Sequence, residues 1–454
     1  MKTSNVCFVA LYAYPLFDTA SRAPFGGSEV RAALLARLVA AKDDLTVHFF
    51  VGHHGAADRQ LIDDVLVHQH PGYPMIGAPA LIAGASARTL VRRLAYAVWA
   101  RLPFRRVLRP VVRPLLALPH RLRPAVGGTE APQAEADGAT AEFAEPCCAS
   151  ETAALLERCA ADVVVTFGVN DVSAETIACC RRRGCASVLC IGSDSDLADH
   201  FRFASEEVDA WGRTSWRGQY ALAHASAIVV QTEWQRQRLA EAFGRDGLII
   251  ANPVVTDPVA PGEGRDIDVL WVGKSDGCKR PELCLELARA LPNRRFHMVM
   301  TRSDPTLHET VLKERPANVT IDDYVPFSEI DGLFARARIL VSTSTLEGFP
   351  NTFLQAGKAG VPIASLVVDP DGFLTATGSG FVAAGDMNAL CAGIERLVSD
   401  EAAWLRASDA VRSYIDRTHN AGRAAEGLVR LIRACADEPE GDKQSSSVAT
   451  LASR

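Results

Sequence analysis

The sequence predicts an α/β protein built from two doubly wound domains that face each other across a cleft. Short β-rich runs alternate with longer runs of helical period, which is the pattern of βαβ units around a parallel sheet. The alternation restarts after a Pro/Gly-rich stretch from Asn252 to Asp266. The chain has 454 residues, more than the roughly 250 to 300 that one hydrophobic core accommodates.

The predicted strands define the two domains. In the first half they span residues 5–13, 45–52, 162–168, 186–191 and 227–231, and in the second half residues 267–273, 296–300, 318–321, 339–342, 363–367 and 380–383. We therefore expect an N-terminal domain over residues 1–252, a linker over 253–266 and a C-terminal domain over 267–410. A helix over 411–436 can return to the N-terminal domain, and the polar tail 437–454 is expected to be disordered.

Composition excludes several classes of protein. The net charge of −6 lacks the basic excess of a nucleic-acid binder. No stretch of about 18 apolar residues is present, so no membrane-spanning helix is expected. The twelve cysteines do not show the paired spacing of zinc ribbons, and no metal site is predicted. Because the start does not resemble a signal peptide, we expect reduced thiols in a cytoplasm.

The sharpest shift in composition lies in the first half. No Asp or Glu occurs from Val65 to Thr129, and ten arginines fall between Arg88 and Arg123. Apolar residues and arginines separate onto opposite faces at helical spacing, which predicts an insertion over about 84–124 that lies on an anionic membrane surface. A plain surface insertion and a nucleic-acid contact are the alternatives. The acidic, low-complexity stretch 127–150 is expected to be a flexible loop.

Parallel sheets bind ligands beyond the carboxyl ends of their strands, and three loops stand out there. In the first loop, Gly26 and Gly27 let the backbone approach a ligand closely, and Ser28 is a candidate N-cap for the following helix. Free amides at such a helix start favour a phosphate or a sugar oxygen. A purely conformational role for the two glycines is the alternative.

The second loop is basic. The strand ends at Gly273 and Lys274, and Lys279 and Arg280 stand before Pro281, a residue that favours the first turn of a helix. Cations beside a helix start can neutralise the charge that grows on a diphosphate leaving group. A solvated basic loop is the alternative.

The third loop is "LEGFPNTFLQAGKAGVP". Its strand delivers Glu347, Gly348 permits a tight turn, and Asn351 or Thr352 can cap the helix that follows. Gln355 lies eight residues after Glu347. One of these two side chains can hold a sugar while the other holds a ribose.

An Asp-Ser-Asp triplet at residues 194–196 also follows a strand. Two carboxylates at this spacing can hold a divalent cation between diphosphate oxygens. Asp369 and Asp371 form a second triplet of the same kind, so the pattern is of low specificity.

Five pieces, in this order, resemble glycosyltransferase family 4, retaining enzymes of the GT-B fold with two Rossmann-like domains. They are "FGGSEVRAALLARLV", "QTEWQRQRLAEAFG", "IIANPV", "WVGKSDGCKRPELCLELA" and "STLEGFPNTFLQAGKAGVPI". The resemblance covers most of the chain apart from the Arg-rich insertion and the polar segments. It implies a sugar transfer from a nucleotide-diphosphate sugar, with UDP- or GDP-sugar as co-substrate and no further cofactor or metal.

The resemblance also implies roles. Lys274, Lys279 and Glu347 would be the catalytic residues, with the lysines on the diphosphate and the glutamate on the hydroxyls of the sugar. Donor contacts would come from Gly26, Gly27, Gly273, Arg280, Gly348, Phe349, Asn351, Thr352 and Gln355. The family more usually has Arg at position 274 and Glu at position 355, and the histidine that many members place near the reacting sugar is missing around Asp194.

The implied reaction is a front-side displacement with retention, in which the diphosphate takes the proton of the acceptor. With the Arg-rich insertion, the sequence favours a lipid-linked or polysaccharide acceptor at the cytoplasmic face of the cell membrane. The alternatives are a degenerate GT-B protein that binds a nucleotide or a partner without turnover, and a metal-dependent transferase that uses the triplet at 194–196.

Overall fold

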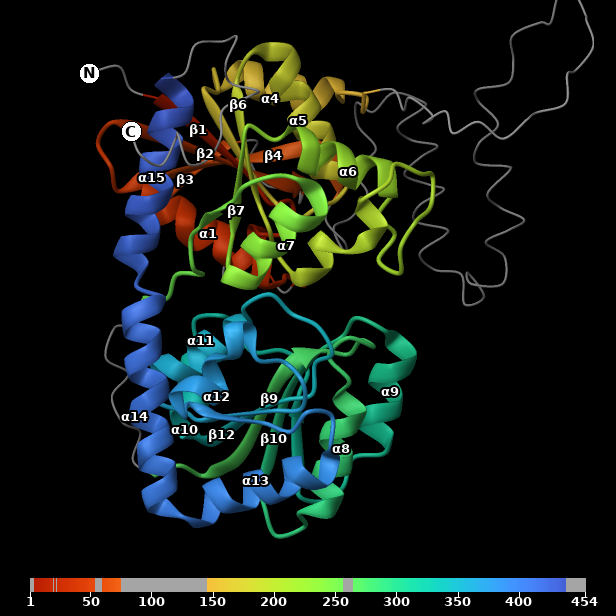
Figure 1. Ribbon diagram of the computed structural model, residues 1–454, viewed down its shortest axis with the longest axis vertical. Helices are drawn as coiled ribbons and strands as arrows, with labels where there is room; N and C mark the ends of the chain where they lie inside the picture. Colours follow the sequence, from red (N-terminus) through yellow and green to blue (C-terminus); the bar gives the residue numbers. More distant parts are fainter. Residues whose placement is uncertain are drawn as a thin grey trace, which may run out of the picture. The chain divides into compact units, whose positions relative to one another are not determined.

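The computed structural model describes residues 4–18, 20–21, 23–53, 59–74, 145–255 and 264–437. These residues form two sheets with helices on both faces of each, and both sheets belong to one compact unit of the chain. The predicted α/β class with two doubly wound sheets is thereby confirmed (Figure 1).

The first sheet has the strand order β3-β4-β2-β1-β5-β6-β7-β8. Its strands are β1 Ser4–Val9, β2 Leu45–His53, β3 Arg59–Ile62, β4 Val65–Pro74, β5 Val163–Phe167, β6 Ala186–Cys190, β7 Ala227–Val230 and β8 Leu248–Ile249. All neighbours pair in parallel except β3 with β4. Strands β3, β4 and β8 were not predicted. Strand β3 exposes alternate residues at the sheet edge, and β8 has two residues, so neither gives a long apolar run.

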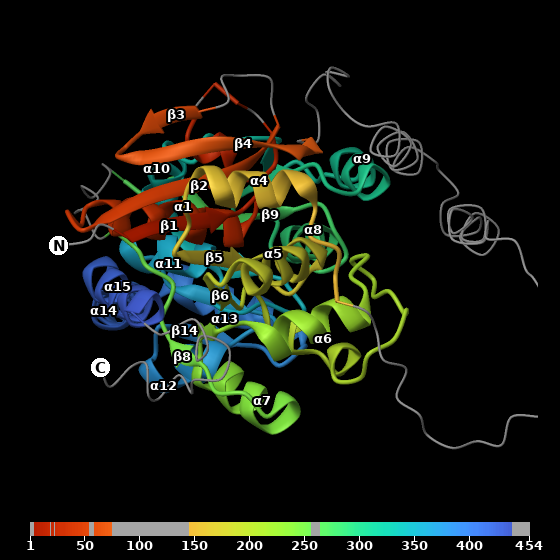
Figure 2. The ribbon, with the colours of Figure 1, turned by 90° about the horizontal axis from the view of Figure 1, so that it is seen from above.

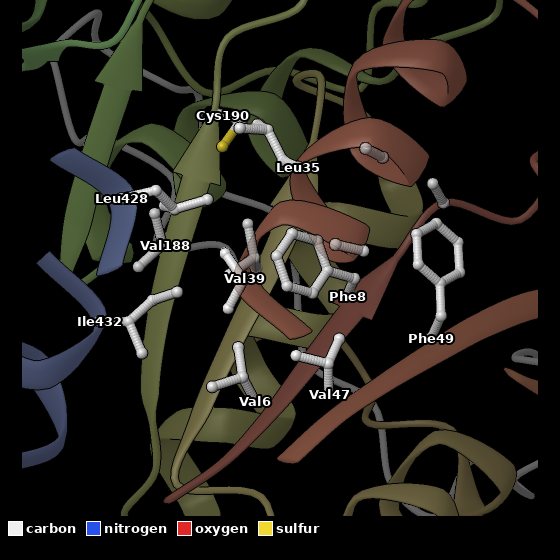
Figure 3. Close-up of a cluster of buried hydrophobic side chains, with 14 of the residues drawn as sticks. Val6, Phe8, Leu35, Val39, Val47, Phe49, Val188, Cys190, Leu428 and Ile432 are labelled. Atoms are coloured by element: carbon white, nitrogen blue, oxygen red, sulfur yellow. The ribbon is translucent and has the colours of Figure 1, made fainter. Parts of the chain in front are cut away.

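Helices cover both faces of this sheet (Figure 2). Helices α1 Gly27–Ala40 and α15 Ala421–Asp437 pack on one face, and α4 Ser150–Arg158, α5 Asp171–Arg183, α6 Ser215–His224 and α7 Glu233–Phe243 pack on the other. Figure 3 shows the core under α1 and α15, where Phe8 of β1 and Val39 of α1 meet Leu428 and Ile432. Burial of these apolar side chains is what holds the last helix of the chain against the first sheet.

The second sheet has the order β11-β10-β9-β12-β13-β14, parallel throughout. Its strands are β9 Ile267–Lys274, β10 Phe296–Thr301, β11 Val319–Asp322, β12 Ala337–Ser342, β13 Ile363–Ser365 and β14 Gly380–Val382. One core contains α8 Pro281–Ala290, α9 Pro305–Lys313 and α13 Met387–Ser399. The core on the opposite face contains α10 Ile330–Arg336, α11 Asn351–Lys358, α12 Phe373–Thr377 and α14 Glu401–Thr418.

The chain passes from the second sheet back to the first between α14 and α15. At this passage the amide of Val254 donates to the carbonyl oxygen of His419 at 2.9 Å, and Nδ1 of His419 lies 2.8 Å from the carbonyl oxygen of Asn252. Burial lowers the pKa of His419 to about 4, so the ring is neutral and Nδ1–H donates to Asn252. The limits of the two domains and of the linker along the chain, as expected from the sequence, stay predictions.

Some predictions fall on other parts of the chain. The Arg-rich insertion at about 84–124, most of the acidic loop 127–150, residues 256–263 of the linker and the tail after residue 437 lie outside the described residues. Within the described residues, no helix combines the length and the apolar character that a membrane span requires.

One prediction about the cysteines is wrong. Cys148 and Cys179 form a disulfide across a Cα–Cα distance of 5.1 Å, whereas all thiols were expected to be reduced. Cys148 stands just before α4 and Cys179 lies in α5, so the packing of these two helices brings the sulfurs together. The separation of 31 residues along the chain gives no local signal of this pairing.

Candidate active site

The carboxyl ends of the strands in the two sheets carry loops that contact each other. The loops after β1, β6 and β7 come from the first sheet, and the loops after β9 and β12 come from the second. A parallel sheet binds ligands at this edge. The hydrogen bonds between these loops define the candidate site.

The loop after β1 ends in the start of α1. Gly26 is the N-cap, and its amide donates to Oε2 of Glu29 at 2.8 Å. The helix begins at Gly27, so Ser28 is its second residue and not its cap. The side chain of Glu29, three residues after the cap, accepts the hydrogen bond from the Gly26 amide. A Cβ atom on Gly26 would lie 3.3 Å from Nζ of Lys274, so the ammonium of Lys274 lies against this turn.

The loop after β9 is folded by one carboxylate. Oδ1 of Asp276 accepts from the amides of Cys278 and Lys279, at 3.0 and 2.9 Å. Arg280 then adopts a φ of 49°, in the left-handed region, before Pro281 opens α8. Nε of Arg280 donates to the carbonyl oxygen of Thr343 at 2.8 Å, so this guanidinium links the loop to the end of β12.

Lys279 and Glu347 form an ion pair between the two loops of the second sheet. Their side chains are 24% and 16% exposed, which leaves both within reach of a ligand. Burial lowers the pKa of Lys279, but the charge of Glu347 and its hydrogen bond outweigh burial, and the net pKa is raised. Lys279 is therefore a cation. It is held beside Glu347, the residue that the family resemblance assigns to the hydroxyls of the sugar.

The turn after Glu347 is held from the first sheet by amide side chains. Oε1 of Gln231 accepts from the amide of Phe349 at 2.8 Å and from Nδ2 of Asn252 at 3.0 Å. Nδ2 of Asn252 also donates to the carbonyl oxygen of Phe349 at 2.9 Å. A Cβ atom on Gly348 would lie 2.9 Å from Nε2 of Gln235, so a larger residue there has to displace one of these side chains.

The donor-binding candidates of this loop have different contacts in the structure. The Phe349 amide is taken by Gln231 and its ring is buried, so Phe349 shapes the turn and does not present a free donor. Pro350 is the N-cap of α11, in place of the expected Asn351 or Thr352. Nδ2 of Asn351 donates to the carbonyl oxygen of Gly27 at 2.9 Å. The side chain of Gln355 is half-buried, and no described residue bonds to it.

The candidate residues therefore fall into two groups. The structure brings together Gly26, Gly27, Lys274, Lys279, Glu347, Gly348 and Asn351, through the contacts given above. Thr352 lies in the first turn of α11 beside Asn351. Gly273 packs against the ring of its neighbour Trp271, where a Cβ atom would lie 2.8 Å away, and Arg280 is turned towards Thr343.

The two aspartates of the 194–196 triplet have different partners. Oδ1 of Asp196 pairs with Arg213 at 2.7 Å, and its Oδ2 accepts from the amide of Gly192 at 2.8 Å. Oδ1 of Asp194 accepts from Nε2 of Gln235 at 2.9 Å, and its amide donates to the carbonyl oxygen of Glu347. Asp196 is thus a buried structural residue, and only Asp194 faces the candidate site.

Burial, together with the charges of Asp371, Asp196 and Glu347, raises the pKa of Asp194 to about 6 against the opposing hydrogen bond from Gln235. A carboxyl group with such a pKa exchanges its proton near neutral pH. It stands next to Glu347, where the sequence reasoning found no catalytic histidine.

Sequence reasoning missed three residues that organise the site, namely Gln231, Gln235 and Asn252, and it named Asp371 only as part of a second acidic triplet. The carboxylate of Asp371 accepts from the amides of Glu233 and Trp234 and so caps α7 from the second sheet. Gln231 directly follows β7, and Asn252 is the third residue after β8. The rule that sites follow strand ends could have found Gln231, whereas no local signal indicates that Asp371 caps α7.

The comparisons with known proteins agree with this architecture. Residues 266–400 match the family described as Glycosyl transferases group 1, and no curated protein matches the sequence. Sucrose-phosphate synthase from Thermosynechococcus elongatus superposes with a TM-score of 0.66 at 14% identity, covering 95% of this chain and 98% of that one. WaaG, a glycosyltransferase involved in lipopolysaccharide biosynthesis, gives 0.56 at 12% identity, covering 94% and 99%.

A mutant of S. aureus TarM, in complex with UDP and α-GlcNAc-glycerol among its ligands, gives a TM-score of 0.52 at 16% identity. This likeness covers 62% of the present chain, which spans 58% of the length of TarM. At these identities the solved structures show the fold, which is GT-B.

Proposed function

We propose that this chain, a glycosyltransferase of the GT-B fold with a group 1 region at residues 266–400, is a retaining enzyme. It moves a sugar from a UDP- or GDP-sugar to a lipid-linked or polysaccharide acceptor. The observation that carries the proposal is the pair of Lys279 and Glu347 beside the turn at Gly26 and Lys274. Two ammonium groups and a carboxylate at one sheet edge match the charges of a diphosphate and the hydroxyls of a sugar.

The lysines would act on the leaving group. When the bond from the anomeric carbon to the diphosphate breaks, negative charge grows on the diphosphate oxygens, and fixed cations stabilise that charge more than the ground state. Lys279 is held in place by Glu347, and the ammonium of Lys274 lies against the turn at Gly26. Since two cations supply this neutralisation, we propose that the reaction requires no metal ion.

The transfer step balances without a nucleophilic side chain. The bond between the anomeric carbon and the diphosphate oxygen breaks, and a bond to the acceptor oxygen forms on the same face of the sugar. The acceptor proton passes to the departing diphosphate. Glu347 would accept hydrogen bonds from the hydroxyls of the sugar, and the first-turn amides of Asn351 and Thr352 would approach the phosphate.

The proposed acceptor and location draw on two observations. WaaG, which has the same fold, is involved in lipopolysaccharide biosynthesis, and this favours a lipid-linked or polysaccharide acceptor. The arginines from Arg88 to Arg123 would hold the protein on an anionic leaflet. We therefore propose a peripheral position on the cytoplasmic face of the cell membrane.

The test measures release of UDP or GDP from a panel of nucleotide sugars, first with water and then with glycan or lipid-linked acceptors. One donor class is expected to turn over. Lys279→Ala should lower kcat about 10²–10³-fold, the usual loss when one charge-stabilising donor is removed. Lys313→Ala is the matched control, since Lys313 is exposed at the end of α9 and should leave kcat unchanged.

Two outcomes would overturn the proposal. A nucleotide sugar that raises the melting temperature without any nucleotide release, with every acceptor, would indicate a binding protein without turnover. Full activity of Lys279→Ala with its best donor would remove Lys279 from the mechanism. A third outcome, loss of activity after EDTA at an unchanged melting temperature that Mg²⁺ or Mn²⁺ restores, would overturn only the metal-independent transfer step.

A further inference from the structure

Four side chains from distant parts of the chain converge on the face of the first sheet that α4 and α5 cover. Cys7 lies in β1, His48 in β2 and His68 in β4, and Cys159 follows the last residue of α4. Cys7 stands opposite His48 in the parallel register, so the two side chains point to the same face. All four are buried, with exposures between 0 and 7%.

The donor atoms of these residues lie close together. Nδ1 of His48 is 3.0 Å from Nε2 of His68, and Sγ of Cys159 is 3.8 Å from the same Nε2. One donor atom from each of these three residues lies within 4.8 Å of the other two. The thiol of Cys7, which stands in β1 opposite His48, lies outside this group of three, and a rotation of its side chain would bring a fourth donor to the ion.

These separations fit a tetrahedral metal ion. With Zn–N bonds of about 2.0 Å and Zn–S bonds of about 2.3 Å, two nitrogens on a tetrahedral ion lie about 3.3 Å apart and a nitrogen and a sulfur about 3.5 Å apart. The observed 3.0 and 3.8 Å differ from these values by a few tenths of an ångström. Small rotations of the side chains are therefore enough to place an ion between them.

Hydrogen bonds alone do not satisfy this cluster. Nε2 of His68 faces both His48 and Cys159, but one ring nitrogen has only a single hydrogen or a single lone pair for the two contacts. A buried polar network that is only partly satisfied is costly, which disfavours an ordinary core cluster.

We propose that Cys7, His48, His68 and Cys159 bind one Zn²⁺ ion in a structural site. Two imidazoles and two thiolates form a ligand set that Zn²⁺ accepts, and the two negative thiolates balance the charge of the ion inside an apolar core. Four protein ligands leave no open position for a substrate, so the site has no part in the sugar transfer. It would tie β1, β2 and β4 to the end of α4.

No local motif announces this site in the sequence. The four ligands lie at positions 7, 48, 68 and 159, without the short Cys-x-x-Cys or His-x-x-x-His spacings of common zinc sites. Only the pairing of β1 with β2 and of β2 with β4 brings three of them onto one face.

The experiment measures zinc in the purified full chain, produced without a metal-affinity step and under thiol-reducing conditions. We expect about one zinc per chain by elemental mass spectrometry. Cys159→Ser should lose it, whereas Cys284→Ser, which changes an equally buried free cysteine of the second sheet, should keep it. Replacement of zinc by Co²⁺ should give a sulfur-to-cobalt charge-transfer band that the Cys159→Ser protein lacks.

If the Cys159→Ser protein does not fold, the zinc proposal is tested on the protein without substitutions. A mercurial reagent that captures thiolates should then release zinc into a chromophoric chelator, and prolonged chelation should lower the melting temperature. A chain without zinc that also fails to bind added Zn²⁺ or Co²⁺ would overturn the proposal. So would a folded Cys159→Ser protein that retains zinc at the level of the unchanged chain.

Discussion

Gly348 is the position where a single methyl group should loosen the contact between the loops of the two sheets. A Cβ atom there would lie 2.9 Å from Nε2 of Gln235 and 3.0 Å from Oε1 of Gln231, closer than a methyl group normally approaches such atoms. Both glutamines are buried. Gly348→Ala therefore has to displace one of them or shift the turn.

The expected loss follows from the hydrogen bonds at stake. Oε1 of Gln231 accepts from the Phe349 amide and from Asn252, at 2.8 and 3.0 Å, and all of these groups are buried. A buried polar group left without its partner costs about 1–3 kcal/mol. With one or two such groups affected, Gly348→Ala should lower the free energy of unfolding by about 1–6 kcal/mol, against a usual total of about 5–15 kcal/mol.

Urea denaturation followed by circular dichroism measures this loss, and Gly332→Ala is the control. Gly332 lies in α10, where a Cβ atom would meet nothing within 4 Å, so alanine should be neutral or slightly stabilising there. The Michaelis constant for the donor should also rise in Gly348→Ala, because the turn carries Glu347. Equal midpoints for Gly348→Ala and the unchanged protein would refute the reasoning.

Three further predictions concern charge and capping. Because the pKa of Asp194 is raised from 3.8 to about 6, the folded chain should lose stability as pH rises through this interval and stay penalised above it. Asp194→Asn should remove this step and be more stable at pH 7 in denaturation series. Gln355→Glu should change the donor Michaelis constant far more than kcat, since a carboxylate bonds ribose hydroxyls more strongly than an amide. Asp371→Ala should cost about 1 kcal/mol and speed hydrogen exchange at the start of α7, whereas Asp371→Asn should keep only one of the two bonds, because its amide has a single acceptor oxygen.

The sequence predicts most of the sheet strands because they are buried on both faces. The Val-rich β5 and the strand β12 are apolar runs bounded by turns, and such runs identify parallel strands. The hairpin of β3 and β4 gives no such signal. His68 and His70 lie buried in β4, so the polar residues that mark this strand in the sequence point into the interior.

The candidate site likewise contains residues that the sequence indicates and residues that it does not. Glycine and lysine beside a strand end are informative because few structural needs place them there, and Gly26, Lys274 and Lys279 do come together. The amide side chains of Gln231 and Asn252 have no comparable signal, since their role depends on a turn more than 90 residues further along the chain. Long-range polar contacts of this kind require the packed structure.

The same contacts separate the residues that hold the loops from those that would meet the donor. Uncharged amides make the bonds from the first sheet to the turn, through Gln231, Asn252 and Asn351. Among the residues that the structure describes, the ammonium of Lys279 forms its ion pair within the second sheet, with Glu347. A diphosphate that draws Lys279 away from Glu347 therefore leaves the amide contacts intact. The turn can keep its shape while the charged pair exchanges partners, and Glu347 is then free to accept from the hydroxyls of the sugar.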